Sequence, residues 1–246
     1  MILQKPPQVR LNKMVGVKLT GETRPATMGA TPVSPYSAWT KYAIPTYNQQ
    51  FPSCVGHATA NWLEMMLRKS VGRDVFKPGQ QIDGDAIWRK GREMFWPKER
   101  LDAGGLLMDQ GFRAAIELGI LPPDSGVMTV HMDIGMVSRM LRTEPVLQGT
   151  AVHNGWNRAN PQNGQIPFEL PNPHAGHATC IVGVLEQDGD VYVLFQNSWG
   201  KNWGHGGYGL LRADQWEQCL LGPVAICKLP DNWTKWTGWK EYVIKP

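Results

Sequence analysis

Apolar residues recur at helical spacing in the first half of the chain and at strand spacing in the second half. The helical spacing predicts four helices, at about Ser53–Lys69, Asp85–Met94, Leu107–Leu118 and Ile134–Arg142. Short apolar runs between Gly, Asn and Pro clusters predict five strands, at Val146–Val152, Thr179–Leu185, Val191–Gln196, Tyr208–Arg212 and Val224–Leu229. Helices that precede strands along a chain are typical of the α+β class.

The same pattern divides the chain into an arm, a domain and a tail. Residues 1–33 are rich in Pro, Thr, Gly and Lys and lack a lasting period, which predicts an extended N-terminal arm. Residues 34–230 are expected to form one domain with a helical lobe at about 50–130 and a β lobe at about 131–230. Residues 231–246 form a Trp-rich tail. Either the arm or the segment Trp233–Trp239 docks to a protein partner, or these tryptophans pack back on the β lobe.

Composition and charge narrow the set of partners. With 246 residues, of which 42% are hydrophobic, the chain can bury a sizeable core. Its net charge is +4 and it has no Lys/Arg block with interleaved aromatic residues, so we do not expect a nucleic acid as partner. Its apolar runs are shorter than the roughly 18 residues of a membrane helix, and Met1–Pro7 lacks the apolar stretch of a signal peptide. We therefore expect no membrane association, and a location in the cytoplasm or in a particle such as a phage virion.

The cysteines do not form the pattern of a disulfide framework or of a metal centre. The four of them, Cys54, Cys180, Cys219 and Cys227, are few and unevenly spaced. No CxxC pair indicates zinc, and we expect neither a metal nor another cofactor. Cys219 and Cys227 are either bridged or remain two free buried thiols in a reducing compartment.

Cys54 opens the first predicted helix, within the run Pro52–Ala58, and Ser53 is expected to be its N-cap. The backbone N–H groups and the dipole at a helix start favour a thiolate over a thiol, and a thiolate is a nucleophile. A buried structural cysteine is the plainer interpretation. The assignment of Cys54 therefore depends on a base elsewhere in the chain.

His177 and Asn197 are the candidate base and the amide that orients it. They flank two predicted strands that are joined by a loop containing Asp188-Gly189. A three-residue loop pairs Glu186 with Asp190 and brings His177 and Asn197 to the same face of the hairpin, within side-chain reach. A two-residue loop would put the two side chains on opposite faces.

The chain also offers candidates for the rest of a thiol-dependent site. With Asn197 at one nitrogen of His177, the other nitrogen is left to meet the sulfur of Cys54. Trp199 either covers the His177–Asn197 hydrogen bond from water or is a core residue. The backbone N–H of Cys54 and the side-chain amide of Gln49, preferred over its neighbour Gln50, are candidate donors to an oxyanion, although a solvated loop is the alternative there.

These segments resemble those of the papain-like (C1) cysteine peptidases. Asn48-Gln49 with Ser53-Cys54 resembles the family's Asn-Gln and Gly-Ser-Cys segment, which implies that Gln49 is the oxyanion glutamine and Cys54 the nucleophile. His177-Ala178 resembles the family's His-Ala segment and implies a base. The run Asn197–Gly204 is the strongest match and implies an orienting role for Asn197 and a shielding role for Trp199. Cys54 precedes His177 by 123 residues and Asn197 by 143, against the roughly 130 to 150 that are typical.

The resemblance spans about Pro35–Leu229 and implies a papain-like fold. In that fold a helical lobe carries the nucleophile, a β lobe carries the histidine and the asparagine, and the active-site cleft lies between the two. The resemblance further implies that Gly104 and Gly105 line the cleft and bind peptide backbone, and that Gly176 helps to wall the specificity pocket. The arm does not resemble an inhibitory propeptide, so the chain looks like a bacterial or phage-type member.

The chain departs from the family pattern around the nucleophile. Gln49 lies five residues before Cys54, where the family usually has six, and Val55 replaces the usual aromatic residue. Phe51 stands where the family has a disulfide cysteine. His57 competes for the role of base, but a residue on the nucleophile's own helix cannot easily stand across the sulfur from the oxyanion site, which favours His177.

The leading hypothesis for function is peptide-bond hydrolysis through a thioester on Cys54, with a peptide or protein as substrate. The alternative is a structural or binding component of a larger assembly, such as a phage particle, built on a papain-like scaffold. A peptidoglycan-directed amidase is a third hypothesis, and the Asn197–Gly200 run argues against it.

Overall fold

The structure is a computed structural model, and it describes residues 35–45, 47–96, 105–171 and 175–245. The predicted N-terminal arm and Gly104 lie outside these residues. The helices are α1 (Cys54–Ser70), α2 (Gly84–Phe95), α3 (Met108–Glu117), α4 (Ile134–Met140) and α5 (Ala213–Cys219). Short 3-10 helices are η1 (Thr40–Tyr42), η2 (Arg73–Val75), η4 (Asn154–Arg158), η5 (Trp233–Lys235) and η6 (Gly238–Tyr242).

The strands form two antiparallel sheets. They are β1 (Gln81–Ile82), β2 (Gly126–Val130), β3 (Val146–Ala151), β4 (Gly176–Gln187), β5 (Asp190–Gln196), β6 (Tyr208–Arg212), β7 (Val224–Lys228) and β8 (Val243–Ile244). Six of them form one sheet in the order β2-β7-β3-β4-β5-β6, and β1 pairs with β8. The predicted α+β class is confirmed, as are the four predicted helices and the five predicted strands, with small shifts at their ends.

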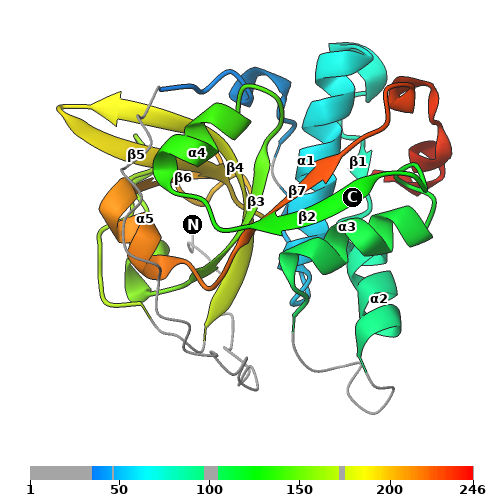
Figure 1. Cartoon of the computed structure of the whole chain (residues 1–246). Coiled ribbons are helices and arrows are strands. Elements are labelled where there is room, and N and C mark those ends of the chain that lie inside the picture. Colours follow the sequence, from blue (N-terminus) through cyan, green and yellow to red (C-terminus); the bar gives the residue numbers. More distant parts are fainter. Residues whose placement is uncertain (1–34, 46, 97–104, 172–174, 246) are drawn as a thin grey trace, which may run out of the picture.

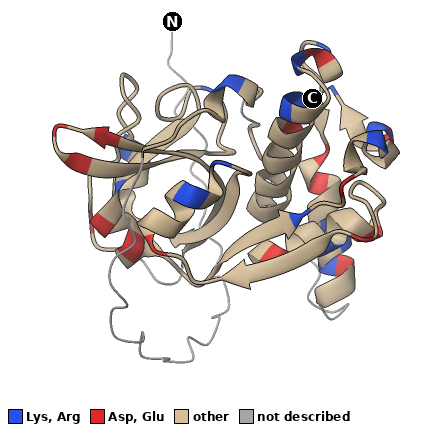
Figure 2. Ribbon diagram, turned by 45° about the horizontal axis from the view of Figure 1, so that its top comes forward, with Lys and Arg blue, Asp and Glu red and all other residues tan. Residues whose placement is uncertain are grey.

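The elements gather in two lobes (Figure 1). Helices α1, α2 and α3 lie in one lobe, and β4, β5, β6, α4 and α5 lie in the other. Strand β2 falls within the range assigned to the helical lobe from the sequence, yet it pairs with β7 in the six-stranded sheet. Within the described residues, no helix is both long and apolar enough to cross a membrane. Figure 2 shows acidic and basic residues intermixed on both lobes.

Helix α1 stands at the junction of the two lobes, where it contacts α2 and α3 on one side and β3 and β4 on the other. Because it is covered on several sides, nearly all of its residues are buried. Its crossing with α2 is unusually close. A Cβ on Gly56 would lie 2.0 Å from the carbonyl oxygen of Gly84, so only glycine fits there. This crossing fixes the start of α1, with Cys54 as its first residue.

The β4–β5 hairpin has the two-residue loop Asp188-Gly189, both with positive φ, so the three-residue loop is wrong. However, the expectation that a two-residue loop separates His177 from Asn197 is also wrong. A β-bulge between Ile181 and Gly183 shifts the register, so that beyond it Cys180 pairs with Gln196. That register is the one a three-residue loop would have given. The bulge therefore brings His177 and Asn197 to the same face of the hairpin.

The C-terminal tail packs on the helical lobe, and the prediction that it packs back on the β lobe is wrong. Its strand β8 pairs with β1, and the indole of Trp236 donates to the carbonyl of Gly119 at 2.8 Å. Trp239 is buried, with its ring centroid 5.4 Å from that of Phe76. These two tryptophans thus contribute to the stability of the helical lobe.

Candidate active site

Cys54 is the first residue of α1, and its side chain is buried at the junction with β4. Ser53 occupies the N-cap position, but its hydroxyl donates to the carbonyl of Phe51 at 3.3 Å and does not cap the helix as predicted. The sulfur of Cys54 lies within hydrogen-bond reach of its own backbone and of the backbone of Val55 and Ala178. Ala178 follows His177 directly. The sulfur is therefore held between the helix start and the strand that carries the histidine.

His177 and Asn197 are brought together as predicted, His177 in β4 and Asn197 directly after β5. The distance from His177 Nε2 to Asn197 Oδ1 is 2.6 Å. Oδ1 also accepts the backbone N–H of Ser198 at 2.7 Å, which identifies this atom as the acceptor. His177 Nε2 must then carry the proton. In the neutral ring, Nδ1 has the free lone pair that a general base requires.

Burial shifts the pKa of both Cys54 and His177. It raises the pKa of the Cys54 thiol, and the surrounding backbone hydrogen bonds lower that pKa in part. It lowers the pKa of His177 to about 4, against the opposing effect of the hydrogen bond to Asn197. Each shift favours a neutral group. A thiolate–imidazolium pair must therefore gain its stability from the attraction between its two charges and from the donors at the start of α1.

Trp199 covers one face of His177, with ring centroids 4.7 Å apart and planes tilted by 32°. A second indole, that of Trp156 in η4, meets His177 edge-on at 5.9 Å. Trp156 is fully buried and also contacts Phe195, Trp199 and Trp203, whose indole donates to its carbonyl at 2.8 Å. We define these four aromatic residues as the aromatic cluster. No sequence pattern singled out Trp156.

Replacing Trp156 with alanine is expected to destabilise the protein by about 3 to 5 kcal/mol, because it empties the centre of the aromatic cluster. The free energy of unfolding in urea measures the loss. Trp233→Ala is the matched control, since that indole is half-buried in the tail and should cost less. A loss below about 1 kcal/mol for Trp156→Ala would contradict the central place given to this side chain.

Gln49 lies beside Asn197, joined to it through Ser198. The backbone N–H of Gln49 donates to the carbonyl of Ser198 at 2.9 Å, and the Ser198 hydroxyl donates to Gln49 Oε1. One hydrogen of Gln49 Nε2 goes to the carbonyl of Phe51 at 2.9 Å, which leaves the other for a further acceptor. Gln50 is exposed and its amide donates to the carbonyl of Asn48. The structure thus places Gln49, and not Gln50, against the Asn197 segment.

The glycines predicted to bind substrate occupy two places. Gly105 precedes α3 in a coil segment and is half-buried. Gly176 opens β4 next to His177, and a Cβ there would lie 2.9 Å from a methyl group of Leu221. Gly149, which pairs with Ala178, faces Met108 at the start of α3. The role of Gly104, Gly105 and Gly176 in substrate binding stays a prediction.

His57, the competing histidine, faces Asp85 on α2. Its Nε2 lies 3.2 Å from Asp85 Oδ1 on α2, and its ring lies 4.6 Å from that of Tyr47. The hydrogen bond to His57 holds the pKa of Asp85 below its ordinary value. His57 is therefore part of the contact between α1 and α2.

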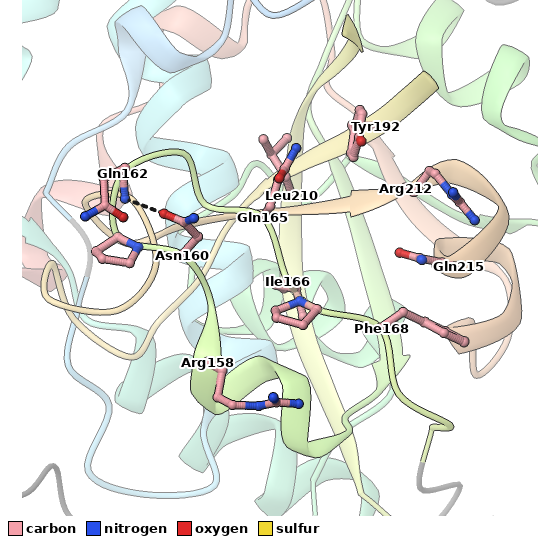
Figure 3. A pocket seen from close by; sticks show the side chains of 12 residues that line it. Arg158, Asn160, Gln162, Gln165, Ile166, Phe168, Tyr192, Leu210, Arg212 and Gln215 are labelled. Atoms are coloured by element: carbon pink, nitrogen blue, oxygen red, sulfur yellow. Dashed lines mark hydrogen bonds between the residues drawn. The ribbon is translucent and has the colours of Figure 1, made fainter. Parts of the chain in front are cut away.

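A cavity of about 490 Å³ lies on the β lobe (Figure 3). Its walls are rich in amide and guanidinium side chains, and they are Arg158, Asn160, Pro161, Gln162, Gln165, Ile166, Pro167, Phe168, Tyr192, Leu210, Arg212 and Gln215. Both arginines are already paired within the chain, Arg158 with Glu169 and Arg212 with Asp214. None of the candidate site residues lines this cavity.

All four cysteines are free, so Cys219 and Cys227 are not bridged.

Comparison with known proteins agrees with this fold. Residues 162–229, which include His177, Asn197 and Trp199, match the family described as papain family cysteine protease. Cathepsin K of Mus musculus is 24% identical over 210 residues, which cover 75% of this chain and 60% of that protein. Pro-cathepsin H of Mus musculus is 39% identical over 54 residues, covering 22% of this chain and 16% of that protein. The chain thus spans less than two thirds of either relative.

Solved structures share the fold at low sequence identity. The bromelain protease from Ananas comosus has a TM-score of 0.58 at 16% identity, covering 78% of this chain and 97% of that one. Xylellain, a cysteine protease from Xylella fastidiosa, has a TM-score of 0.58 at 18% identity, covering 81% of this chain and 91% of that one. The fold is papain-like. The chain resembles the papain family cysteine proteases in sequence over residues 162–229 and in fold over most of its length. Its resemblance to bacterial or phage-type members stays a prediction.

Proposed function

We propose that this chain is a cysteine peptidase that hydrolyses peptide bonds in peptide or protein substrates through a thioester on Cys54. The observation that carries the proposal is the hydrogen bond from His177 Nε2 to Asn197 Oδ1, because it leaves Nδ1 as the basic nitrogen. The sulfur of Cys54 lies beside the backbone that follows His177. A nucleophile, a base and an orienting group are thus available in the order that acyl transfer requires.

The first step forms the acyl-enzyme. The thiol proton of Cys54 passes to His177 Nδ1, and the sulfur attacks the carbonyl carbon of the scissile peptide bond. The backbone N–H of Cys54 and the second hydrogen of Gln49 Nε2 stabilise the oxyanion, a contribution of about 3 to 4 kcal/mol per donor in comparable sites. As the C–N bond breaks, the proton on His177 goes to the leaving amine.

The second step releases the acid. His177, neutral again, takes a proton from water, and the resulting hydroxide attacks the thioester carbonyl. The C–S bond breaks and the proton returns to the sulfur of Cys54. Trp199 keeps bulk water from the His177–Asn197 hydrogen bond throughout, because its ring lies against the imidazole.

Covalent labelling tests the proposal. The bromelain structure is a complex with the inhibitor E64, which makes that compound the natural probe here. We expect one equivalent of the inhibitor to attach to Cys54, located by mass spectrometry of the digested protein. The three other cysteines are buried and serve as internal controls. An intact fold, verified by circular dichroism, that takes up no label at Cys54 would contradict the proposal.

A further inference from the structure

Glu64 is a carboxyl group buried in α1, ten residues after Cys54, with 1% of its surface exposed. Its Oε1 accepts the backbone N–H of Ile82 at 2.6 Å and is hydrogen-bonded to the hydroxyl of Tyr47. Its Oε2 is buried and has no hydrogen-bond partner among the residues that the structure describes. An ionised carboxylate in this position would leave one charged oxygen without a donor, which is costly in a protein interior.

The hydrogen bonds around Tyr47 indicate whether Glu64 carries a proton. The Tyr47 hydroxyl oxygen is within hydrogen-bond distance of two oxygens, Glu64 Oε1 and the carbonyl oxygen of Ile82. A tyrosine hydroxyl donates only one hydrogen, and the carbonyl of Ile82 can only accept. If Tyr47 donates to Ile82, the contact with Glu64 requires a hydrogen on the carboxyl. Both contacts are hydrogen bonds only when Glu64 is protonated.

The charged groups near Tyr47 and Glu64 are consistent with a protonated Glu64. Burial raises the pKa of Glu64 to about 8, although the hydrogen bonds of Tyr47 and Ile82 and the charge of Arg68 oppose the shift. Arg68 gives its guanidinium hydrogens to the carbonyls of Tyr42, Ala43 and Arg73. From α2 and its N-cap, Asp85 pairs with His57, and Asp83 adds a negative charge near Tyr47.

Tyr47 connects this cluster to the candidate active site. It precedes Gln49 by two residues, and Asn48 between them forms an isolated antiparallel β-bridge with Trp199. The segment 47–49 is therefore fixed to α1 at one end, through Tyr47, and to Ser198 at the other, through Gln49. Because α1 also carries Cys54, Tyr47 links the position of Gln49 to that of the nucleophile.

We propose that Tyr47 and a protonated Glu64 are positioning residues that hold the segment of Gln49 against the helix of Cys54. The catalytic consequence rests on the proposed function, whereas the protonation of Glu64 does not. Ionisation of Glu64 leaves a single hydroxyl hydrogen on Tyr47 for two acceptors, Glu64 and the carbonyl of Ile82. One of the two contacts is then lost, and the attachment of the segment of Gln49 weakens.

The first experiment measures the protonation through stability. Folding takes up a proton at Glu64 between its ordinary pKa and about 8, so wild-type stability due to this group is complete below pH 4.5 and is lost as the pH rises toward 8. Glu64→Gln is neutral at every pH. We expect the folding equilibrium constant of Glu64→Gln, relative to wild type, to rise about tenfold per pH unit from pH 5 to 8, and to level off above.

Unfolding in urea at each pH gives the two constants. Glu93→Gln, at an exposed glutamate on α2, is the matched control and should follow wild type throughout. A ratio for Glu64→Gln that stays constant from pH 5 to 8 would overturn the protonated state. This measurement needs no substrate, so its failure is distinct from a failure of the proposed function.

The second experiment tests positioning. In Tyr47→Phe, which removes only the hydroxyl, we expect faster hydrogen exchange at the backbone N–H of Gln49 and a kcat lowered about tenfold with little change in KM. In wild type the same exchange should accelerate above pH 8, beyond the intrinsic pH effect, and in Glu64→Gln this extra acceleration should be absent. Unchanged exchange at Gln49 in Tyr47→Phe would overturn the positioning role, whether or not the protein cleaves a peptide.

Discussion

Cys54→Ala is expected to abolish peptide hydrolysis while leaving the fold intact. The substitution removes the proposed nucleophile and keeps His177, Asn197 and the proposed oxyanion donors in place. In hydrolases with a comparable set of residues, loss of the nucleophile lowers kcat on the order of a millionfold, since the remaining groups cannot form the covalent intermediate. Turnover of a fluorogenic peptide measures the effect. Urea unfolding should show a change of less than about 1 kcal/mol.

The matched control is Cys219→Ala, which removes another buried thiol that lies in α5 of the β lobe. We expect it to retain hydrolysis and labelling by the inhibitor. Hydrolysis that persists in Cys54→Ala, at a rate within about a hundredfold of wild type, would assign the nucleophile to another residue. Loss of activity in both variants would instead indicate a requirement for β-lobe stability.

The elements that could be predicted from the sequence are those whose signals are local. Helix α2 begins after Asp83, whose carboxylate accepts the N–H of Ala86, and α3 is followed by Gly119 with φ of +73°. A capping aspartate and a glycine with positive φ are local signals that mark where a helix starts and ends. Strands β1 and β8 have only two residues each, so they carry no period that could reveal them.

The register of the β4–β5 hairpin could not be predicted because its bulge depends on a distant segment. Tyr36 exchanges both backbone hydrogen bonds with Val184, and a Cβ on Gly183 would lie 3.0 Å from Ser37. The extra residue in β4 thus accommodates a chain crossing more than 140 positions away in sequence. The run around Asn197 indicated the partnership of His177 and Asn197, but their common face results from the bulge and not from a three-residue loop.

Trp156 was missed because it lies in a short 3-10 helix without hydrophobic periodicity. Its burial depends on the aromatic cluster, whose other members lie about 40 to 50 residues further along the chain, within residues 195–203. The preceding residue, Gly155, is the sequence feature that could have indicated close packing at this point of the chain. A Cβ on Gly155 would lie 1.8 Å from the carbonyl oxygen of Pro167, so the chain passes too closely there for any other residue.

His177→Ala is expected to lower kcat on the order of a millionfold, as loss of the base does in comparable sites. The variant keeps Cys54 buried, where desolvation raises the pKa of its thiol. Without an imidazole to accept the proton, the thiol stays neutral and attacks poorly. The leaving amine also loses its proton donor. We therefore expect the rate of labelling at Cys54 to fall together with peptide hydrolysis.

His57→Gln is the comparison that decides between the two histidines. His57 lies on the same helix as Cys54, but its Nε2 faces Asp85 on α2, and a glutamine amide can still donate to that carboxylate. We expect this variant to keep kcat within about tenfold of wild type, with its main effect on the free energy of unfolding. The opposite pattern, with hydrolysis lost in His57→Gln and kept in His177→Ala, would transfer the role of base to α1. Asn197 would then orient a ring that takes no part in proton transfer.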